Sequence, residues 1–171
     1  MNGSLRKQAW SDIHFEEGGC EVSCRMPLSI KEIGLHDGAV DMVLLMMESF
    51  TDTEYVQSYG CSLLSNLILE VDAEHLPTLL SEGKPSAIHS VLRAMKTFPR
   101  AADLQAAGCK FLSLVADFSL PNQHVLKEMA TSHGALTILS SAIENHANDD
   151  YEEGRVIQEC GRRALRWLLV W

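Results

Sequence analysis

The sequence predicts an all-α protein built from about three tandem helical repeats. Similar segments recur along the chain, apolar residues follow helical spacing, and no alternating strand pattern is present. The repeat domain is predicted to span residues 28–171, in units of about 28–70, 74–117 and 122–171. Residues 1–27 match no unit and are either the end of an earlier helix or an unstructured start.

A recurring glutamine sets the period of the repeat. Gln57 and Gln105 are 48 residues apart, and Gln105 and Gln158 are 53 residues apart. The longer second interval predicts a five-residue insertion in the polar run from Glu144 to Gly154, because repeat proteins accommodate insertions in loops. Each unit is predicted to hold a short segment followed by two longer helices. The short segments are residues 30–34, 78–82 and 126–130.

The longer segments have helical periodicity. Apolar residues of the first unit follow the i, i+1, i+4, i+5, i+8 pattern of one helix face, and the second unit repeats it. These residues are Ala39, Val40, Val43, Leu44 and Met47, then Ile88, Val91, Leu92 and Met95. The helices that follow carry Leu63, Leu64 and Leu67, matched by Phe111, Leu112 and Val115. Helix breaks are predicted at residues 51–53, Gly83 with Pro85, Pro99 and Pro121.

A glycine follows each recurring glutamine by three residues, inside a predicted helix. These glycines are Gly60, Gly108 and Gly161. Because a glycine inside a helix costs up to about 1 kcal/mol relative to alanine, its recurrence predicts that another helix crosses close to the backbone there. Cys61 and Cys109 come directly after two of these glycines, and they are predicted to be small buried hydrophobes rather than reactive thiols.

Composition and charge limit the function. The chain has 171 residues, of which 46% are hydrophobic, and this composition is typical of a globular domain. The net charge of −9 argues against nucleic acid as a partner, and indicates either solubility or a basic partner segment. The five cysteines, the missing signal peptide and the lack of an apolar run of about 20 residues predict a reducing cytosol or nucleus, with no membrane span.

The segment from Gln57 to Leu67 resembles the armadillo repeat family, whose third helix opens with Gln-x-x-(Ala/Gly)-Cys-x-x-Leu-x-Asn-Leu. The second copy keeps Gln105, Gly108, Cys109 and Leu112, and the third keeps Gln158, Gly161, Leu165 and Leu168. The resemblance implies a right-handed superhelical solenoid of three-helix units. It also implies that the third helices line a groove for extended peptides, with an Asn that clamps the ligand backbone. Residues 95–105 also resemble the armadillo units of leucine-rich-repeat (Roco) kinases.

Only Asn66 carries over at the clamping position, where the later units have Leu114 and Trp167. The import adaptors of the family place a Trp four residues earlier, and this chain has Ser62, Lys110 and Arg163 at those positions. The resemblance therefore predicts a protein-interaction scaffold or adaptor rather than a reader of nuclear signals. Its partner-binding residues are expected to be Ser62, Asn66, Lys110, Leu114, Arg163 and Trp167. The alternative is a fragment of a larger scaffold or kinase, with a structural or regulatory docking role.

No enzymatic role, cofactor or metal is expected. The sequence has no nucleophile elbow, glycine-rich phosphate loop or His-Glu-x-x-His motif. Cys20 and Cys24 could form half of a metal site, but no second Cys or His pair is near them in the sequence, and a structural zinc needs four ligands. Two unrelated loop thiols are the preferred interpretation.

Three clusters leave alternatives open. The apolar C-terminus indicates a piece of a longer array, or an end that packs on itself, on a partner or on a second copy. The residues of this apolar end are Leu165, Trp167, Leu168, Leu169, Val170 and Trp171. A basic cluster, either solvated charge or a patch for an acidic partner, consists of Lys110, Arg162, Arg163 and Arg166. An acidic run, which either solubilises a loop or meets a basic partner, consists of Asp149, Asp150, Glu152 and Glu153.

Overall fold

The structure is a computed structural model of the chain, and it describes residues 38–70, 86–118 and 134–169. These residues form six α-helices and no strand, which confirms the predicted all-α class. The helices are α3 (Ala39–Ser49), α4 (Glu54–Glu70), α6 (Ala87–Thr97), α7 (Ala102–Phe118), α9 (Ala135–Asn145) and α10 (Glu152–Leu169). The expected short segments, residues 1–27 and the breaks at Pro85 and Pro121 lie outside the described residues.

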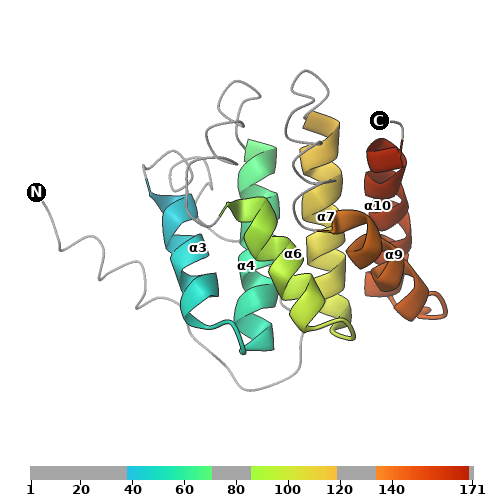
Figure 1. The fold of residues 1–171 in the computed structure, drawn as a ribbon, viewed down its shortest axis with the longest axis horizontal. Helices are drawn as coiled ribbons and strands as arrows, with labels where there is room; N and C mark the ends of the chain where they lie inside the picture. The colour runs from blue at the N-terminus through green and yellow to red at the C-terminus, as the bar shows by residue number, and fades with distance from the viewer. Residues whose placement is uncertain (1–37, 71–85, 119–133, 170–171) are drawn as a thin grey trace, which may run out of the picture.

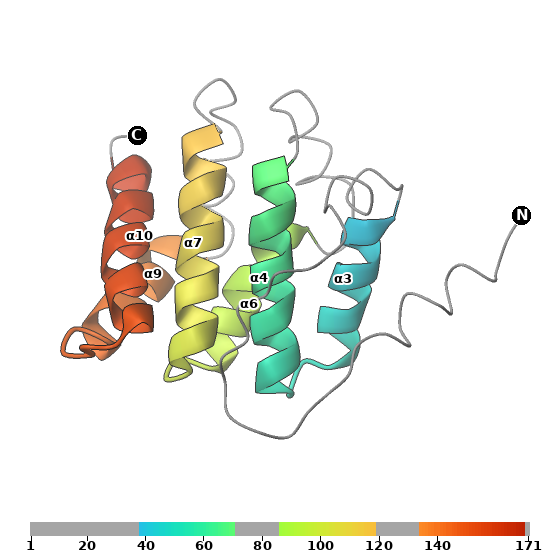
Figure 2. The ribbon, with the colours of Figure 1, turned by 180° about the vertical axis from the view of Figure 1, so that it is seen from behind.

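The helices form three consecutive pairs, each with a short helix followed by a long one. The long helices α4, α7 and α10 stand side by side in one row (Figure 2), and α7 contacts both of its neighbours extensively. The short helices α6 and α9 pack on the opposite side of this row (Figure 1). The breaks predicted at residues 51–53 and at Pro99 fall between the helices of the first two pairs, as expected.

The recurring glutamine joins the two helices of each pair. Its side-chain amide donates hydrogen bonds to two backbone carbonyls at the end of the preceding short helix, where carbonyls lack helical partners. The Nε2 to O distances are 2.7 and 2.8 Å from Gln57 to Met47 and Phe50, 2.8 and 2.9 Å from Gln105 to Met95 and Phe98, and 2.7 and 3.4 Å from Gln158 to Ile143 and His146. Three turns are thus held in the same way, which accounts for the repeated glutamine.

The recurring glycines lie where the two helices of a pair cross. A Cβ atom added to Gly60 would lie 2.5 Å from Met47 Cγ, and one added to Gly108 would lie 2.5 Å from Met95 Sδ. At Gly161 the corresponding distance, to Ile143 Cγ1, is 3.1 Å. The predicted close approach of a second helix is therefore confirmed, and it is tightest in the first two pairs.

The third pair divides its insertion between a loop and a helix. The connection from α9 to α10 spans residues 146–151, two residues longer than the connections at 50–53 and 98–101. Helix α10 also begins six residues before Gln158, whereas α4 and α7 begin three residues before their glutamines. The acidic Glu152 and Glu153 therefore belong to the first turn of α10, and only Asp149 and Asp150 remain in the predicted loop.

One apolar core runs through all three pairs. The predicted core residues of the second unit are buried, and Cys61 and Cys109 are fully buried, as expected. At the C-terminal side, Leu168 is buried and Trp167 packs partly against the core, whereas Leu169 is 71% exposed. The apolar end of α10 thus packs mainly on its own protein, while Val170 and Trp171 lie outside the described residues. No helix in the described ranges has the length and apolar content to cross a membrane.

Candidate functional site

The six residues expected to bind a partner occupy matching positions on the three long helices. They stand five and nine residues after the recurring glutamine. We call the surface they share the third-helix face, because each long helix corresponds to the expected third helix of its unit. Lys110 and Arg163 are exposed, and the other four members are half-buried. The members are Ser62 and Asn66 on α4, Lys110 and Leu114 on α7, and Arg163 and Trp167 on α10.

Asp117 of α7 brings two of these residues together. Its carboxylate accepts hydrogen bonds from Arg163 Nε at 3.1 Å and from Trp167 Nε1 at 3.2 Å, and it forms an ion pair with Arg163 Nη2 at 2.8 Å. The guanidinium and the indole are thus fixed relative to each other and to α7. Asp117 was missed in the sequence analysis, although it lies three residues after Leu114 and so on the same side of its helix.

Lys110 and Arg163 both lie near the thiol of Cys160, between α7 and α10. Cys160 is half-buried, and burial raises its pKa, with a further contribution from the negative charge of Glu159. The cations of Arg163 and Lys110 oppose this shift, which places both within electrostatic range of the sulfur. The seam between α7 and α10 therefore carries charges of both signs, and Arg163 is the cation that pairs with Asp117.

The α4 part of the third-helix face is uncharged and partly aromatic. Tyr55 is 58% exposed and Leu69 is 51% exposed, and both share a helix side with Ser62 and Asn66. Among the described residues no group forms a hydrogen bond with the Asn66 side chain, which leaves its amide available to a ligand. The helical spacing of Tyr55 and Leu69 relative to Asn66 was the signal that could have identified them.

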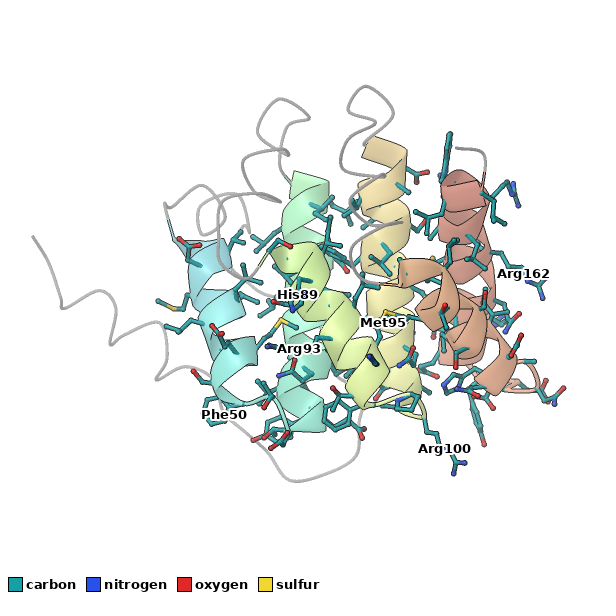
Figure 3. The ribbon with its side chains drawn as sticks, viewed as in Figure 1. Phe50, His89, Arg93, Met95, Arg100 and Arg162 are labelled. Atoms are coloured by element: carbon teal, nitrogen blue, oxygen red, sulfur yellow. The ribbon has the colours of Figure 1, made fainter. Side chains whose placement is uncertain are left out.

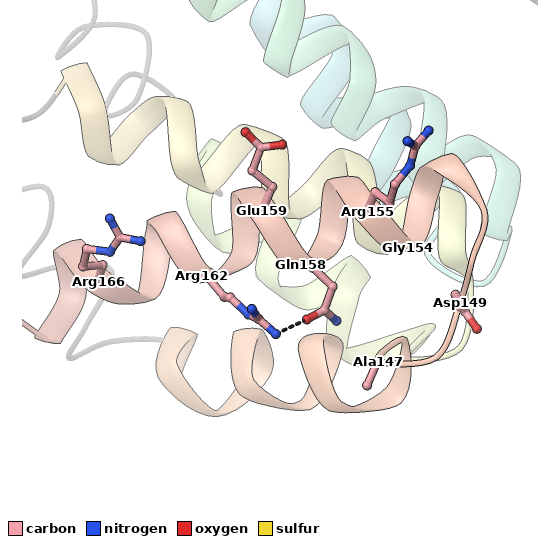
Figure 4. A pocket seen from close by; sticks show the side chains of 8 residues that line it. All are labelled: Ala147, Asp149, Gly154, Arg155, Gln158, Glu159, Arg162 and Arg166. Atoms are coloured by element: carbon pink, nitrogen blue, oxygen red, sulfur yellow. Dashed lines mark hydrogen bonds between the residues drawn. The ribbon is translucent and has the colours of Figure 1, made fainter.

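A hollow lies on the outer side of α10, beside the end of α9 (Figure 4). Arg162 and Arg166 line it, and Arg162 Nη2 donates to Gln158 Oε1 at 2.8 Å. At the positions that Arg162 and Arg166 occupy, helix α7 has Cys109 and Ser113, which are buried. The outer side of α10 therefore carries charged side chains where the preceding long helix has small, buried ones, and this is the character of a solvent-facing end of a helical stack.

The opposite end of the stack is apolar. Met42 is 43% exposed, Leu45 is 63% exposed and Tyr59 is 45% exposed, and we call these three residues the first-unit end face. The matching positions of the second unit are Ser90, Arg93 and Ala107, which are buried or half-buried against the first unit. Figure 3 shows Arg93 on the side of α6 that lies toward α3 and α4, with Arg162 at the far end of the stack.

The described residues offer no metal centre and no activated thiol. No group of three or more His, Cys, Asp or Glu side chains within them is arranged to hold a metal ion. Burial raises the pKa of the Cys61 and Cys109 thiols to about 12, so both stay protonated at neutral pH. The Cys20 and Cys24 pair lies outside the described residues.

No protein-family model, no curated protein and no solved structure matches the chain.

Proposed function

We propose that the chain is a protein-interaction module, an armadillo-like right-handed solenoid whose third-helix face binds an extended segment of another protein. The observation that carries the proposal is the row of α4, α7 and α10 (Figure 2), in which the expected contact residues stand at the same two positions of each helix. The glutamine clamp found in all three pairs supports the repeat on which this row depends.

The spacing of the row suits an extended ligand. Packed helices lie about 8–10 Å apart, and an extended chain advances about 3.3 Å per residue. Each long helix would therefore meet about every third residue of a segment that crosses the row. Asn66 would clamp its backbone on α4, while Leu114 and Trp167 would contact its side chains on α7 and α10.

The proposed role is non-catalytic and needs no cofactor. The thiols of Cys61 and Cys109 are held protonated by burial, and they serve the core rather than chemistry. The free thiols of Cys61, Cys109 and Cys160 support a reducing compartment, the cytosol or the nucleus, as the place where the protein acts.

A selection from a displayed library of random peptides tests the proposal. The wild-type chain is compared with Asn66→Ala/Lys110→Ala, which changes the third-helix face, and with Arg162→Ala/Arg166→Ala, which changes the outer side of α10. All three proteins are first checked for equal helicity. Peptides that bind the wild type and the α10 control but not the third-helix variant would support the proposal. Equal binding to all three proteins, or no enrichment on the wild type, would contradict it.

The second candidate is a piece of a larger scaffold or kinase, in which this chain docks on further helical repeats. The first-unit end face favours it, because Met42, Leu45 and Tyr59 stand where the second unit is covered by the first. In the purified chain a second copy can cover this face. Sedimentation analysis should then show association that rises with concentration and is lost in Leu45→Glu. A chain that stays monomeric at every concentration would count against this candidate.

A further inference from the structure

The seam between α7 and α10 is the most organised polar cluster on the third-helix face. We infer that this seam recognises a carboxylate side chain, so that the segment bound by the face carries Asp or Glu beside an apolar residue. The inference rests on the proposed function and adds the chemistry of the partner. The residues that support it are Lys110, Leu114, Asp117, Arg163 and Trp167.

Arg163 is oriented in advance of binding. Asp117 holds its Nε and Nη2 atoms at 3.1 and 2.8 Å, while the side chain remains 56% exposed. The remaining guanidinium N–H groups have no partner among the described residues and can donate to a ligand. A planar guanidinium held in place loses less conformational freedom when it binds a carboxylate than a freely rotating side chain would.

Lys110 supplies a second cation from the neighbouring helix. It is exposed, and no described residue forms an ion pair with it. Asp117, two helical turns further along the same helix, is already bonded to Arg163 and Trp167. Glu159 stands one helical turn before Arg163 on α10, and no described residue forms an ion pair with it. The ammonium of Lys110 is likewise left without an ion-pair partner among the described residues, so an incoming carboxylate can neutralise it.

An apolar contact lies next to these donors. Leu114 is half-buried on α7, and the indole of Trp167 is fixed by the same carboxylate that holds Arg163. A rigid indole offers a large contact area at a small entropic cost. Residues 38–70 contain no Lys or Arg, so the α4 end of the face offers no cation to an acidic residue. An acidic residue is thus expected only in the part of the ligand that crosses α7 and α10.

Peptides from the selection described above serve as the probes. Each acidic peptide is made with Glu, with Gln and with phosphoserine at the acidic position, and binding is measured to wild type, Lys110→Gln and Lys96→Gln. Lys96 is an exposed lysine of α6, outside the third-helix face, and serves as the matched control.

Enrichment of Asp or Glu beside an apolar residue is expected. Lys110→Gln should weaken binding of the Glu peptide about fivefold, the upper range for an exposed ion pair. The same variant should leave binding of the Gln peptide unchanged. Lys96→Gln should weaken the binding of neither peptide. Peptides that are lost on the third-helix variant but show no acidic enrichment, or that bind equally well with Gln, would overturn the inference and leave the proposed function standing. Phosphoserine at least tenfold tighter than Glu would overturn the assignment to a carboxylate. Peptides that ignore the third-helix face would overturn both.

Discussion

The glutamine clamp makes a graded prediction about stability. Methionine in place of Gln105 keeps the volume but cannot donate to the carbonyls of Met95 and Phe98, which lie 2.8 and 2.9 Å away. Gln105 is 1% exposed, so water cannot replace the lost bonds. Each bond contributes about 1 kcal/mol, and the Met95 carbonyl left without a partner costs about 1–3 kcal/mol, whereas the Phe98 carbonyl keeps its bond from Ala101 N at 3.2 Å. Apolar burial of the methionine offsets part of this, and we expect a net loss of about 2–4 kcal/mol.

The third pair supplies the internal comparison. Gln158 is half-buried, and its second bond, to His146, is 3.4 Å long. Gln158→Met should therefore cost about 1 kcal/mol, close to one ordinary hydrogen bond. Urea unfolding followed by circular dichroism measures both changes, as midpoint shifts at an unchanged m-value. Equal losses in Gln105→Met and Gln158→Met, or no loss in Gln105→Met, would refute the reasoning that the amide satisfies the end of the short helix.

Three further predictions follow from named contacts. Gly108→Ala should cost more stability in urea unfolding than Gly161→Ala, because its Cβ would lie 2.5 Å rather than 3.1 Å from the crossing side chain; equal costs would contradict the close crossing. Asp117→Ala should lower stability by about 1 kcal/mol and, in a chain whose Trp10 and Trp171 are replaced by Phe, increase the fluorescence response of Trp167 to a quencher; an unchanged quenching profile would count against the contact of Asp117 with Trp167. Burial raises the pKa of Cys109 from 9.0 to about 12. The unfolded chain therefore loses this proton first, and stability should fall as the pH rises above 9, less steeply in Cys109→Ala. Parallel pH profiles of the two proteins would contradict it.

Much of the fold could be predicted from local sequence patterns. Gln105, Gly108 and Cys109 stand in the same order and spacing as Gln57, Gly60 and Cys61, and each type has one physical role. The glutamine satisfies a helix end, the glycine admits a crossing side chain and the cysteine fills the core. These roles act between helices that are adjacent in the chain, so the periodicity carries them.

The contacts between units could not be predicted in the same way. Asp117 and Arg163 are 46 residues apart, and their pairing depends on how α7 and α10 are stacked. Their helical periodicity places each on a face but does not show which residue of the next helix it meets. The split of the insertion between a loop and the first turn of α10 was also hidden, because Glu152 and Glu153 suit a loop and a helix start equally well.

The two ends of the stack show that periodicity matters more than composition. The run from Leu165 to Leu169 is mostly apolar, yet the helix turns Leu168 into the core and Arg166 toward the hollow on its outer side. The first unit shows the reverse effect, because Leu63 matches the fully buried Phe111 in the repeat but is only half-buried.

The most direct test of the central claim is a nuclear magnetic resonance titration of a selected peptide into the 15N-labelled chain, which at 18.9 kDa suits the method. The indole N–H of Trp167 and the side-chain amide of Asn66 report from α10 and α4, respectively. Shifts at both positions, with Leu114 between them, are the predicted result. Shifts confined to Arg162 and Arg166 on the outer side of α10, or to the short helices α3, α6 and α9, would contradict a binding surface on the third-helix face.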